Sequence, residues 1–310
     1  LYILMNTIAL IAGAINILTI IFSHSLRRSQ CYQMMLYICV LDSIQAFIAL
    51  ISGFLTIWPV KNDSSTKIAG AFFEPLWICM MYFVFLLSVN RLSIIIDVQL
   101  YKQFIITLCK FLWIFSMFIA AAFFIAFLTP NVTMRYDAFT YSWRYIRTSE
   151  AFVIAMTEAC SLTPLSILSF INYIIILIAI NRKKRSHSLQ MSSISSSEKR
   201  ILIQSIALFS LTTTGVFFDF FNFYLFPATK WMYFILNLTR QTCIVMVPLL
   251  NLLFNVSLRM KAFELVKYAY DRLRGSPTAV RCTTIASTNR AATIFSTPQL
   301  RIQSQLPICA

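Results

Sequence analysis

Four of the ionisable side chains inside the long apolar segments of this chain could together form a charged site within a membrane. They are Glu74, Glu158, Asp219 and Arg240. Ionisable groups inside membrane-spanning segments are costly and are functional candidates by default. A buried arginine requires a carboxylate partner, and we expect Asp219 or Glu158 to pair with Arg240. Because one arginine cannot neutralise every acid, either water enters this region or some carboxyl groups are protonated.

Two interpretations of this charged set stay open. In the first, an ion pair joins the sixth and seventh apolar segments and has a structural role only. In the second, these groups lie in the outer half of a helix bundle and line a water-accessible ligand cavity. The candidate residues of that cavity are Glu74, Trp77, Met81, Glu158, Phe218, Asp219, Asn222, Tyr233 and Arg240.

A second polar set lies deeper in the apolar segments and contains Asn16, Asp42 and Asn251. These side chains could share water or an ion between helices. Alternatively, they serve only as hydrogen-bonding groups that hold neighbouring helices together.

The elements that must position both sets are seven apolar segments. Each is long enough for a helix to cross the hydrocarbon core, which takes ~20 residues. In lipid every backbone polar group must be satisfied within its own segment, so these segments predict helices. We therefore predict an all-α fold, a seven-transmembrane helix bundle with a short amphipathic cytosolic helix after the seventh span. The expected spans are Leu1–Phe22, Tyr32–Trp58, Ala71–Ile96, Phe111–Leu128, Ala151–Ile180, Ile201–Phe226 and Trp231–Phe254.

The distribution of basic residues predicts the orientation. Of the 26 lysine and arginine residues, 19 fall on one side of the spans, six on the other and one within the seventh span. The positive-inside rule puts the basic side in the cytosol and the N-terminus outside the cell. The net charge of +15 is thus a topology signal and not evidence of nucleic-acid binding. Two sequons in predicted outer loops agree, and Asn62 and Asn131 are the expected glycosylation sites.

Three regions follow from this topology. Residues 1–256 form the seven-transmembrane domain, residues 257–274 an amphipathic helix on the inner membrane surface, and residues 275–310 a disordered cytosolic tail. In the second region, apolar residues recur at helical spacing opposite a charged face. The tail is rich in serine and threonine.

Enzyme chemistry has little support in the sequence. The eight cysteines show no metal-binding spacing, and both histidines, His24 and His187, lie outside the spans. There is no H-E-x-x-H motif and no lysine within the seventh span that could hold retinal as a Schiff base. We predict a protein that is not an enzyme and that has no metal and no cofactor.

The order of several residues along the spans resembles the landmarks of G protein-coupled receptors. These landmarks are Asn16, Leu41-Asp42-Ser43, Asn90-Arg91-Leu92, Trp113, Pro164 and Pro248. More specifically, the chain looks like a nematode serpentine chemoreceptor of class T. The motifs that carry this resemblance are Ser25-Leu26-Arg27-Arg28-Ser29-Gln30-Cys31-Tyr32-Gln33-Met34-Met35, Ser88-Val89-Asn90-Arg91, Glu198-Lys199-Arg200 with Gln204-Ser205, and Phe254-Asn255-Val256-Ser257-Leu258-Arg259.

The resemblance implies a plasma-membrane receptor that binds a small molecule from outside and activates a heterotrimeric G protein inside. It implies a coupling role for Arg91, whose alternative role is that of an anchor at the inner leaflet. The residues expected to face the G protein are Asn90, Arg91, Lys102, Arg182, Lys183, Lys184, Arg185, Lys199 and Arg200.

The chain also departs from the common receptor pattern. Asn90 stands where an acid usually precedes the arginine of span 3, and span 6 contains no proline. Val247 and Asn251 stand where the usual span 7 motif has asparagine and tyrosine, respectively. The outer loops contain no cysteine.

A transporter or channel is the alternative function. It would use Glu158, Asp219 and Arg240 as a relay within the membrane. Inverted repeats or helices broken by glycine or proline would favour it, and neither is evident among only five glycines.

Overall fold

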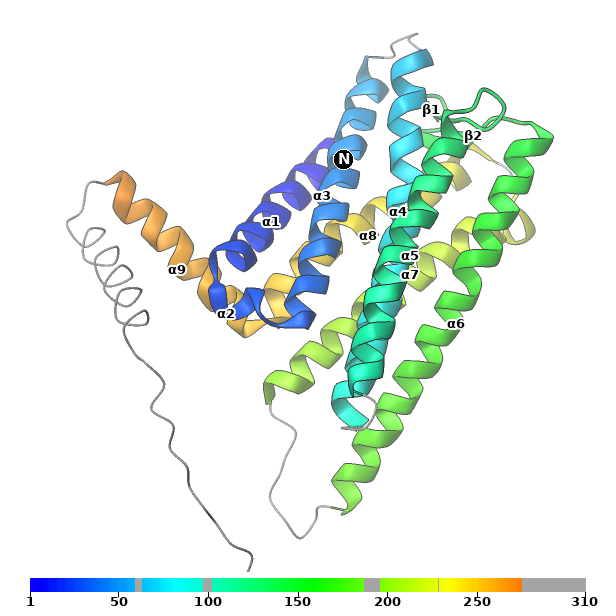
Figure 1. The fold of residues 1–310 in the computed structure, drawn as a ribbon. Helices are drawn as coiled ribbons and strands as arrows, with labels where there is room; N and C mark the ends of the chain where they lie inside the picture. The colour runs from blue at the N-terminus through cyan, green and yellow to red at the C-terminus, as the bar shows by residue number, and fades with distance from the viewer. Residues whose placement is uncertain (59–62, 97–101, 187–195, 228, 275–310) are drawn as a thin grey trace, which may run out of the picture. The chain divides into compact units, whose positions relative to one another are not determined.

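The computed structural model describes residues 1–58, 63–96, 102–186, 196–227 and 229–274, and Figure 1 shows its arrangement. Nine helices and two strands occur in these ranges. They are α1 (Tyr2–Phe22), α2 (His24–Arg27), α3 (Gln30–Ile57), α4 (Asp63–Ile96), α5 (Lys102–Leu128), β1 (Met134–Asp137), β2 (Ser142–Tyr145), α6 (Ser149–Ser186), α7 (Ser196–Leu225), α8 (Lys230–Phe254) and α9 (Val256–Leu273).

Seven of the described helices are long and apolar enough to cross a membrane, which confirms the seven expected spans. Several helices continue beyond the predicted apolar limits. For example, α4 begins at Asp63 and α6 ends at Ser186. Hydropathy detects only the part of a helix that can lie in hydrocarbon, whereas the backbone hydrogen bonds continue into the polar surroundings.

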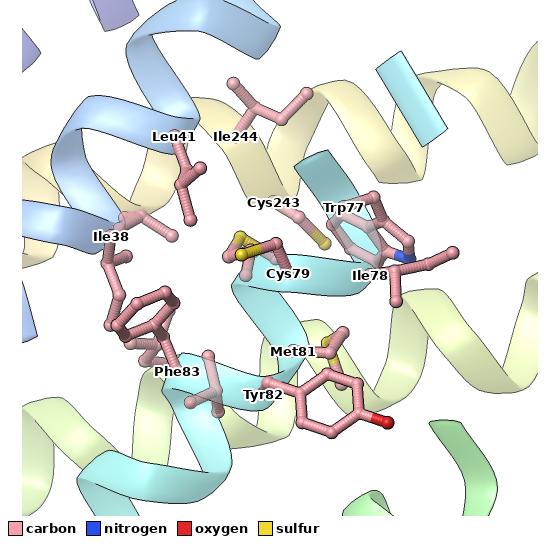
Figure 2. Close-up of a cluster of buried hydrophobic side chains, with 14 of the residues drawn as sticks. Ile38, Leu41, Trp77, Ile78, Cys79, Met81, Tyr82, Phe83, Cys243 and Ile244 are labelled. Carbon is pink, nitrogen blue, oxygen red and sulfur yellow. The ribbon is translucent and has the colours of Figure 1, made fainter. Parts of the chain in front are cut away.

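Helix α4 is the central element of the bundle. It packs against α3, α5, α6 and α7 and also contacts β1. Its large side chains are buried, and Phe73, Trp77, Ile78 and Phe83 belong to the apolar core. Figure 2 shows this core where α4 meets α3 and α8, with Ile38 and Leu41 from α3 and Cys243 and Ile244 from α8.

Helices α5 and α6 instead expose many large apolar side chains. Phe118 of α5 is 72% exposed and Phe152 of α6 is 66% exposed. In water such surfaces would be unfavourable, whereas lipid tails are as apolar as these side chains. The exposed apolar residues therefore mark the lipid-facing side of the two helices.

A two-stranded antiparallel hairpin joins α5 to α6 and was not predicted. Met134 pairs with Tyr145, and Asp137 pairs with Ser142 at the turn. The Asp137 side chain closes the turn, because it accepts hydrogen bonds from the backbone N–H of Phe139 (3.0 Å) and the hydroxyl of Thr140 (2.8 Å). Below, the end of the bundle that carries β1 and β2 is called the hairpin end.

The chain divides into two compact units, residues 1–262 and 263–310. The first contains the spans, the hairpin and the first turns of α9, where Leu258 and Ala262 are buried. The described part of the second unit continues α9 to Leu273, where a helix was expected. The predicted tail, residues 275–310, lies outside the described residues.

Candidate functional site

A buried ion pair between Arg240 and Glu74 forms the centre of the candidate site. Arg240 Nη2 lies 2.6 Å from Glu74 Oε1, and the two residues are 8% and 3% exposed. The expected partners of Arg240, Asp219 and Glu158, are therefore wrong as direct ion-pair partners. The ion pair joins α8 to α4 and not α8 to α7, because the central helix α4 presents Glu74 to the face of α8 that carries Arg240.

Two aromatic rings of α4 also hold the Arg240 guanidinium. Its carbon atom lies 4.8 Å from the Phe73 ring centroid and 4.9 Å from that of Trp77. A guanidinium over an aromatic face is attracted by the ring quadrupole, and the attraction grows when water is excluded. Phe73, Glu74 and Trp77 thus form one binding surface for the guanidinium on a single helical turn.

Glu158 of α6 connects this centre to the hairpin. The Tyr145 hydroxyl donates a 2.6 Å hydrogen bond to Glu158 Oε2. Burial, with the neighbouring Glu158 carboxylate, raises the pKa of Tyr145 well above its ordinary value, so Tyr145 keeps its proton at neutral pH. The Glu158 carboxyl also faces that of Glu74. Such a contact becomes a hydrogen bond when one of the two carboxyl groups carries a proton.

Asp219 of α7 lies near this group but outside its hydrogen bonds. Its side chain is partly exposed and interacts with Arg240 through charge alone. One turn further, Asn222 is 3% exposed, and its Nδ2 donates to the Asp219 backbone carbonyl at 2.6 Å. Within the described residues, Asn222 Oδ1 has no hydrogen-bond partner.

The four remaining residues that were expected to line the cavity lie in different surroundings. Trp77 is buried beneath Arg240, and Met81 is buried one turn further along α4, in the apolar core. Phe218 packs against Phe217 and Phe226. Tyr233 lies under the guanidinium of Arg144 from β2, 4.3 Å from carbon to ring centroid. The structure therefore brings Glu74, Trp77, Glu158 and Arg240 together and directs Tyr233 toward the hairpin.

The hairpin is fastened to other helices by polar contacts. The hydroxyls of Tyr136 and Thr56 lie 2.6 Å apart, which joins β1 to α3. The Tyr141 carbonyl accepts a 2.6 Å hydrogen bond from Asn237 Nδ2 of α8. The sequence analysis did not identify Tyr145, Tyr136 or Tyr141. The signal that could have found them is the cluster of aromatic and basic residues in the short loop between spans 4 and 5.

The deeper polar set does not form one directly bonded cluster. Asn16 Nδ2 donates to the Pro248 carbonyl at 2.9 Å. Asn251 Nδ2 donates to Cys39 Sγ at 3.1 Å, and Asn251 Oδ1 accepts from Gln204, which the sequence did not assign to this polar set.

Asp42 is the third member of the deeper set and is 2% exposed. Both of its carboxyl oxygens lack a hydrogen-bond partner among the described residues. Within the same residues, no group of three or more His, Cys, Asp or Glu side chains could hold a metal ion.

At the end opposite the hairpin, Arg91 is partly buried and its Nη2 donates to Cys31 Sγ of α3. The neighbouring Asn90 is 5% exposed, and its Nδ2 has no partner within the described residues. Arg182 and Arg200 are exposed. The side chains of the other expected coupling residues lie outside the described part of the structure; these are Lys102, Lys183, Lys184, Arg185 and Lys199.

The two expected glycosylation sites differ in what the structure describes. Asn131 is exposed in the turn between α5 and β1, and its carbonyl accepts a hydrogen bond from the Thr148 hydroxyl. Asn62 lies outside the described residues.

The fold is a seven-helix bundle of the rhodopsin type. The crystal structure of squid rhodopsin matches with a TM-score of 0.68 and 12% sequence identity, over 86% of this chain and 84% of that one. At this identity the match shows the fold alone. No curated protein matches the chain.

The family assignment comes from the sequence profile described as serpentine type 7TM GPCR chemoreceptor Srt, which matches residues 1–274. The chain belongs to this family of G protein-coupled chemoreceptors, and the resemblance to class T is confirmed. The family is generally non-enzymatic, and neither comparison supports a transporter or channel.

Proposed function

We propose that this chemoreceptor binds a small molecule in a cavity at the hairpin end and activates a heterotrimeric G protein from the opposite end. One observation carries the proposal. Strand β2 contributes Tyr145 to the same buried group that contains Glu74 of α4, Glu158 of α6 and Arg240 of α8. A ligand that enters this group must rearrange contacts among four elements.

The ligand acts by favouring one arrangement of these elements. Equal affinity for two arrangements would shift neither. Glu74, Glu158, Arg240 and Trp77 are buried under the hairpin contacts, whereas Asp219, Phe218 and Tyr233 are partly exposed. The ligand therefore meets the partly exposed side chains first and reaches the ion pair only after the hairpin contacts loosen.

In this proposal the hairpin end lies outside the cell and the protein spans the plasma membrane seven times, with the N-terminus outside. The uneven distribution of basic residues and the exposed Asn131 support this orientation.

The orientation is tested by expressing Asn131→Gln and measuring the loss of glycan mass. Asn237→Gln is the matched control, because the Asn237 sequon lies inside α8 and should carry no glycan. An unchanged mass in Asn131→Gln, together with glycan on a residue of the opposite end, would reverse the orientation.

At the other end, Arg91 would contact the G protein once the bundle opens. Its partial burial beside Cys31 supports a residue that is held in place at rest and released on activation. The basic residues of the third inner loop, from Arg182 to Arg200, would form the rim of the same surface.

The full chain, reconstituted in lipid nanodiscs with purified heterotrimeric G proteins of several subtypes, tests the function. We expect guanine nucleotide exchange above that of empty nanodiscs. Proteoliposomes of the same preparation are assayed for ion and solute flux. Flux without nucleotide exchange would contradict the proposal and favour a transporter or channel.

A further inference from the structure

The acids around Arg240 outnumber it, and the one that is not bonded within the group lies on α7. Glu74, Glu158 and Asp219 face one arginine, Arg240. Arg240 is paired with Glu74 at 2.6 Å and lies over the rings of Phe73 and Trp77. The pairing leaves two acids to account for.

Glu158 is one of these two acids. The Glu158 carboxyl lies against that of Glu74. The Tyr145 hydroxyl donates a hydrogen bond to Glu158 Oε2. Both acids are thus engaged within the group, Glu74 by Arg240 and Glu158 by Tyr145.

Asp219 is the third acid of this group. Within the described residues, no hydrogen bond or ion pair reaches its carboxylate, and the side chain is partly exposed. Two cations of the hairpin end have other partners. Lys230 lies over the Tyr141 ring at 4.7 Å, and Arg144 lies 3.5 Å from Asp137 and over the Tyr233 ring.

A second, independent observation at the same place points to a ligand that donates hydrogen bonds. Asn222 is buried one turn from Asp219, and its side chain is directed back toward that turn by the bond from Nδ2 to the Asp219 carbonyl. Its Oδ1 is a buried acceptor without a partner among the described residues. Leaving a buried acceptor unpaired is unfavourable, and a donor placed there would remove the cost.

We propose that the ligand of this receptor is a small organic cation whose ammonium group binds between the Asp219 carboxylate and Asn222 Oδ1 on α7. The inference rests on the proposed receptor function and names the chemical class of its ligand. An ammonium group supplies the donors and the charge that the two acceptors lack. A carboxylate ligand would meet a second negative charge at the same place.

Matched thiol reagents of opposite charge test the site without knowledge of the natural ligand. Asn222→Cys is introduced into the full chain with Cys160, the one exposed cysteine among the described residues, replaced by serine. The variant reacts with trimethylammonium-ethyl methanethiosulfonate or with sulfonatoethyl methanethiosulfonate. Each rate is divided by the rate of the same reagent with free 2-mercaptoethanol, and the Cys160→Ser parent measures reaction at the remaining cysteines.

We expect the cationic reagent to be favoured by about tenfold or more over the anionic reagent, as expected for one unneutralised charge a few ångströms away. Adding Asp219→Asn should abolish the preference, and Asp219→Glu should keep it. Glu150→Gln is the matched control, because Glu150 is exposed at the start of α6, and its loss should leave the preference unchanged.

Equal normalised rates, a preference for the anionic reagent, a preference that survives Asp219→Asn, or no reaction with either reagent would overturn the inference. The thiol rates do not depend on a G protein. A clear cationic preference in a chain that activates no G protein would therefore refute the receptor function and leave the cation site standing. G protein activation without the preference would support the receptor function and refute the cation site.

Discussion

The Tyr145 hydroxyl lies 2.6 Å from Glu158 Oε2, so a residue of the hairpin is bonded directly to a buried acid of α6. Glu158 in turn faces Glu74, the ion-pair partner of Arg240. The hairpin, α6, α4 and α8 are therefore connected through four side chains. Any movement of the hairpin away from α6 must break the first of these contacts.

Replacing Tyr145 with phenylalanine should loosen this connection. We expect the free energy of unfolding to fall by about 1.5–3 kcal/mol, the usual contribution of a hydrogen bond to a charged group, and basal nucleotide exchange to rise. Thermal unfolding of the purified receptor and the nanodisc exchange assay measure the two effects. Tyr136→Phe is the control, because it removes the Thr56 contact and leaves Glu158 untouched. Equal basal exchange in the two variants would argue against a special role for Tyr145.

The Arg240–Glu74 pair should behave as a buried ion pair. Arg240→Gln leaves Glu74 without its cation and should cost about 3–5 kcal/mol of stability, whereas Glu74→Gln should cost less because Glu158 and Asp219 remain near the arginine, and the double variant should recover part of the loss. A double-mutant cycle in thermal or denaturant unfolding gives the coupling energy. The same cycle for Arg240 and Asp219 should give a smaller coupling energy. The reverse order would contradict the observed pairing.

Gly70 should be required for the contact between α4 and the hairpin. A Cβ atom at this position would lie 2.2 Å from the backbone carbonyl oxygen of Met134, so one of the two backbones must shift. We expect Gly70→Ala to lower stability by about 1–3 kcal/mol and to raise basal exchange as β1 moves. Gly215→Ala is the comparison, because its new Cβ would come no closer than 3.3 Å to the Cys243 side chain. An equal or smaller effect at Gly70 would contradict this prediction.

Arg91 should be needed for signalling and not for folding. We expect Arg91→Ala to abolish G protein activation at normal surface expression, and Arg91→Lys to retain part of it, because lysine keeps the charge but not the planar group. Surface labelling and nucleotide exchange measure the two properties. Arg259→Ala is a control, since Arg259 lies in α9 and its side chain donates only to the carbonyl of Leu253 among the described hydrogen bonds. Full signalling by Arg91→Ala would contradict the coupling role and favour the alternative role of Arg91 as an anchor at the inner leaflet.

Much of the fold could be predicted because its signals are local. A run of apolar residues such as Tyr2–Phe22 must be helical in lipid, whatever its neighbours are. The hairpin could not be predicted in this way. Met134–Asp137 is only four residues long, and its alternating burial arises from contacts with α3 and α4 that lie far away in the sequence.

The candidate site was predicted as a set of residues and not as a set of contacts. Length and hydropathy place Glu74, Glu158, Asp219 and Arg240 at similar depths, but depth says nothing about which way each helix is rotated. The pairing of Arg240 with Glu74 depends on that rotation, and so does the separation of Asp219 from the ion pair.

The sequence by itself thus determined the seven spans, the depth of the ionisable residues and the receptor family. These follow from the cost of placing polar groups in hydrocarbon and from motifs read in order along the chain. Only the tertiary structure decided that Arg240 binds Glu74, that Tyr145 reaches Glu158, and that Asp219 and Asn222 remain as acceptors. Side-chain partners between helices are set by helix rotation and close packing, which no single segment encodes.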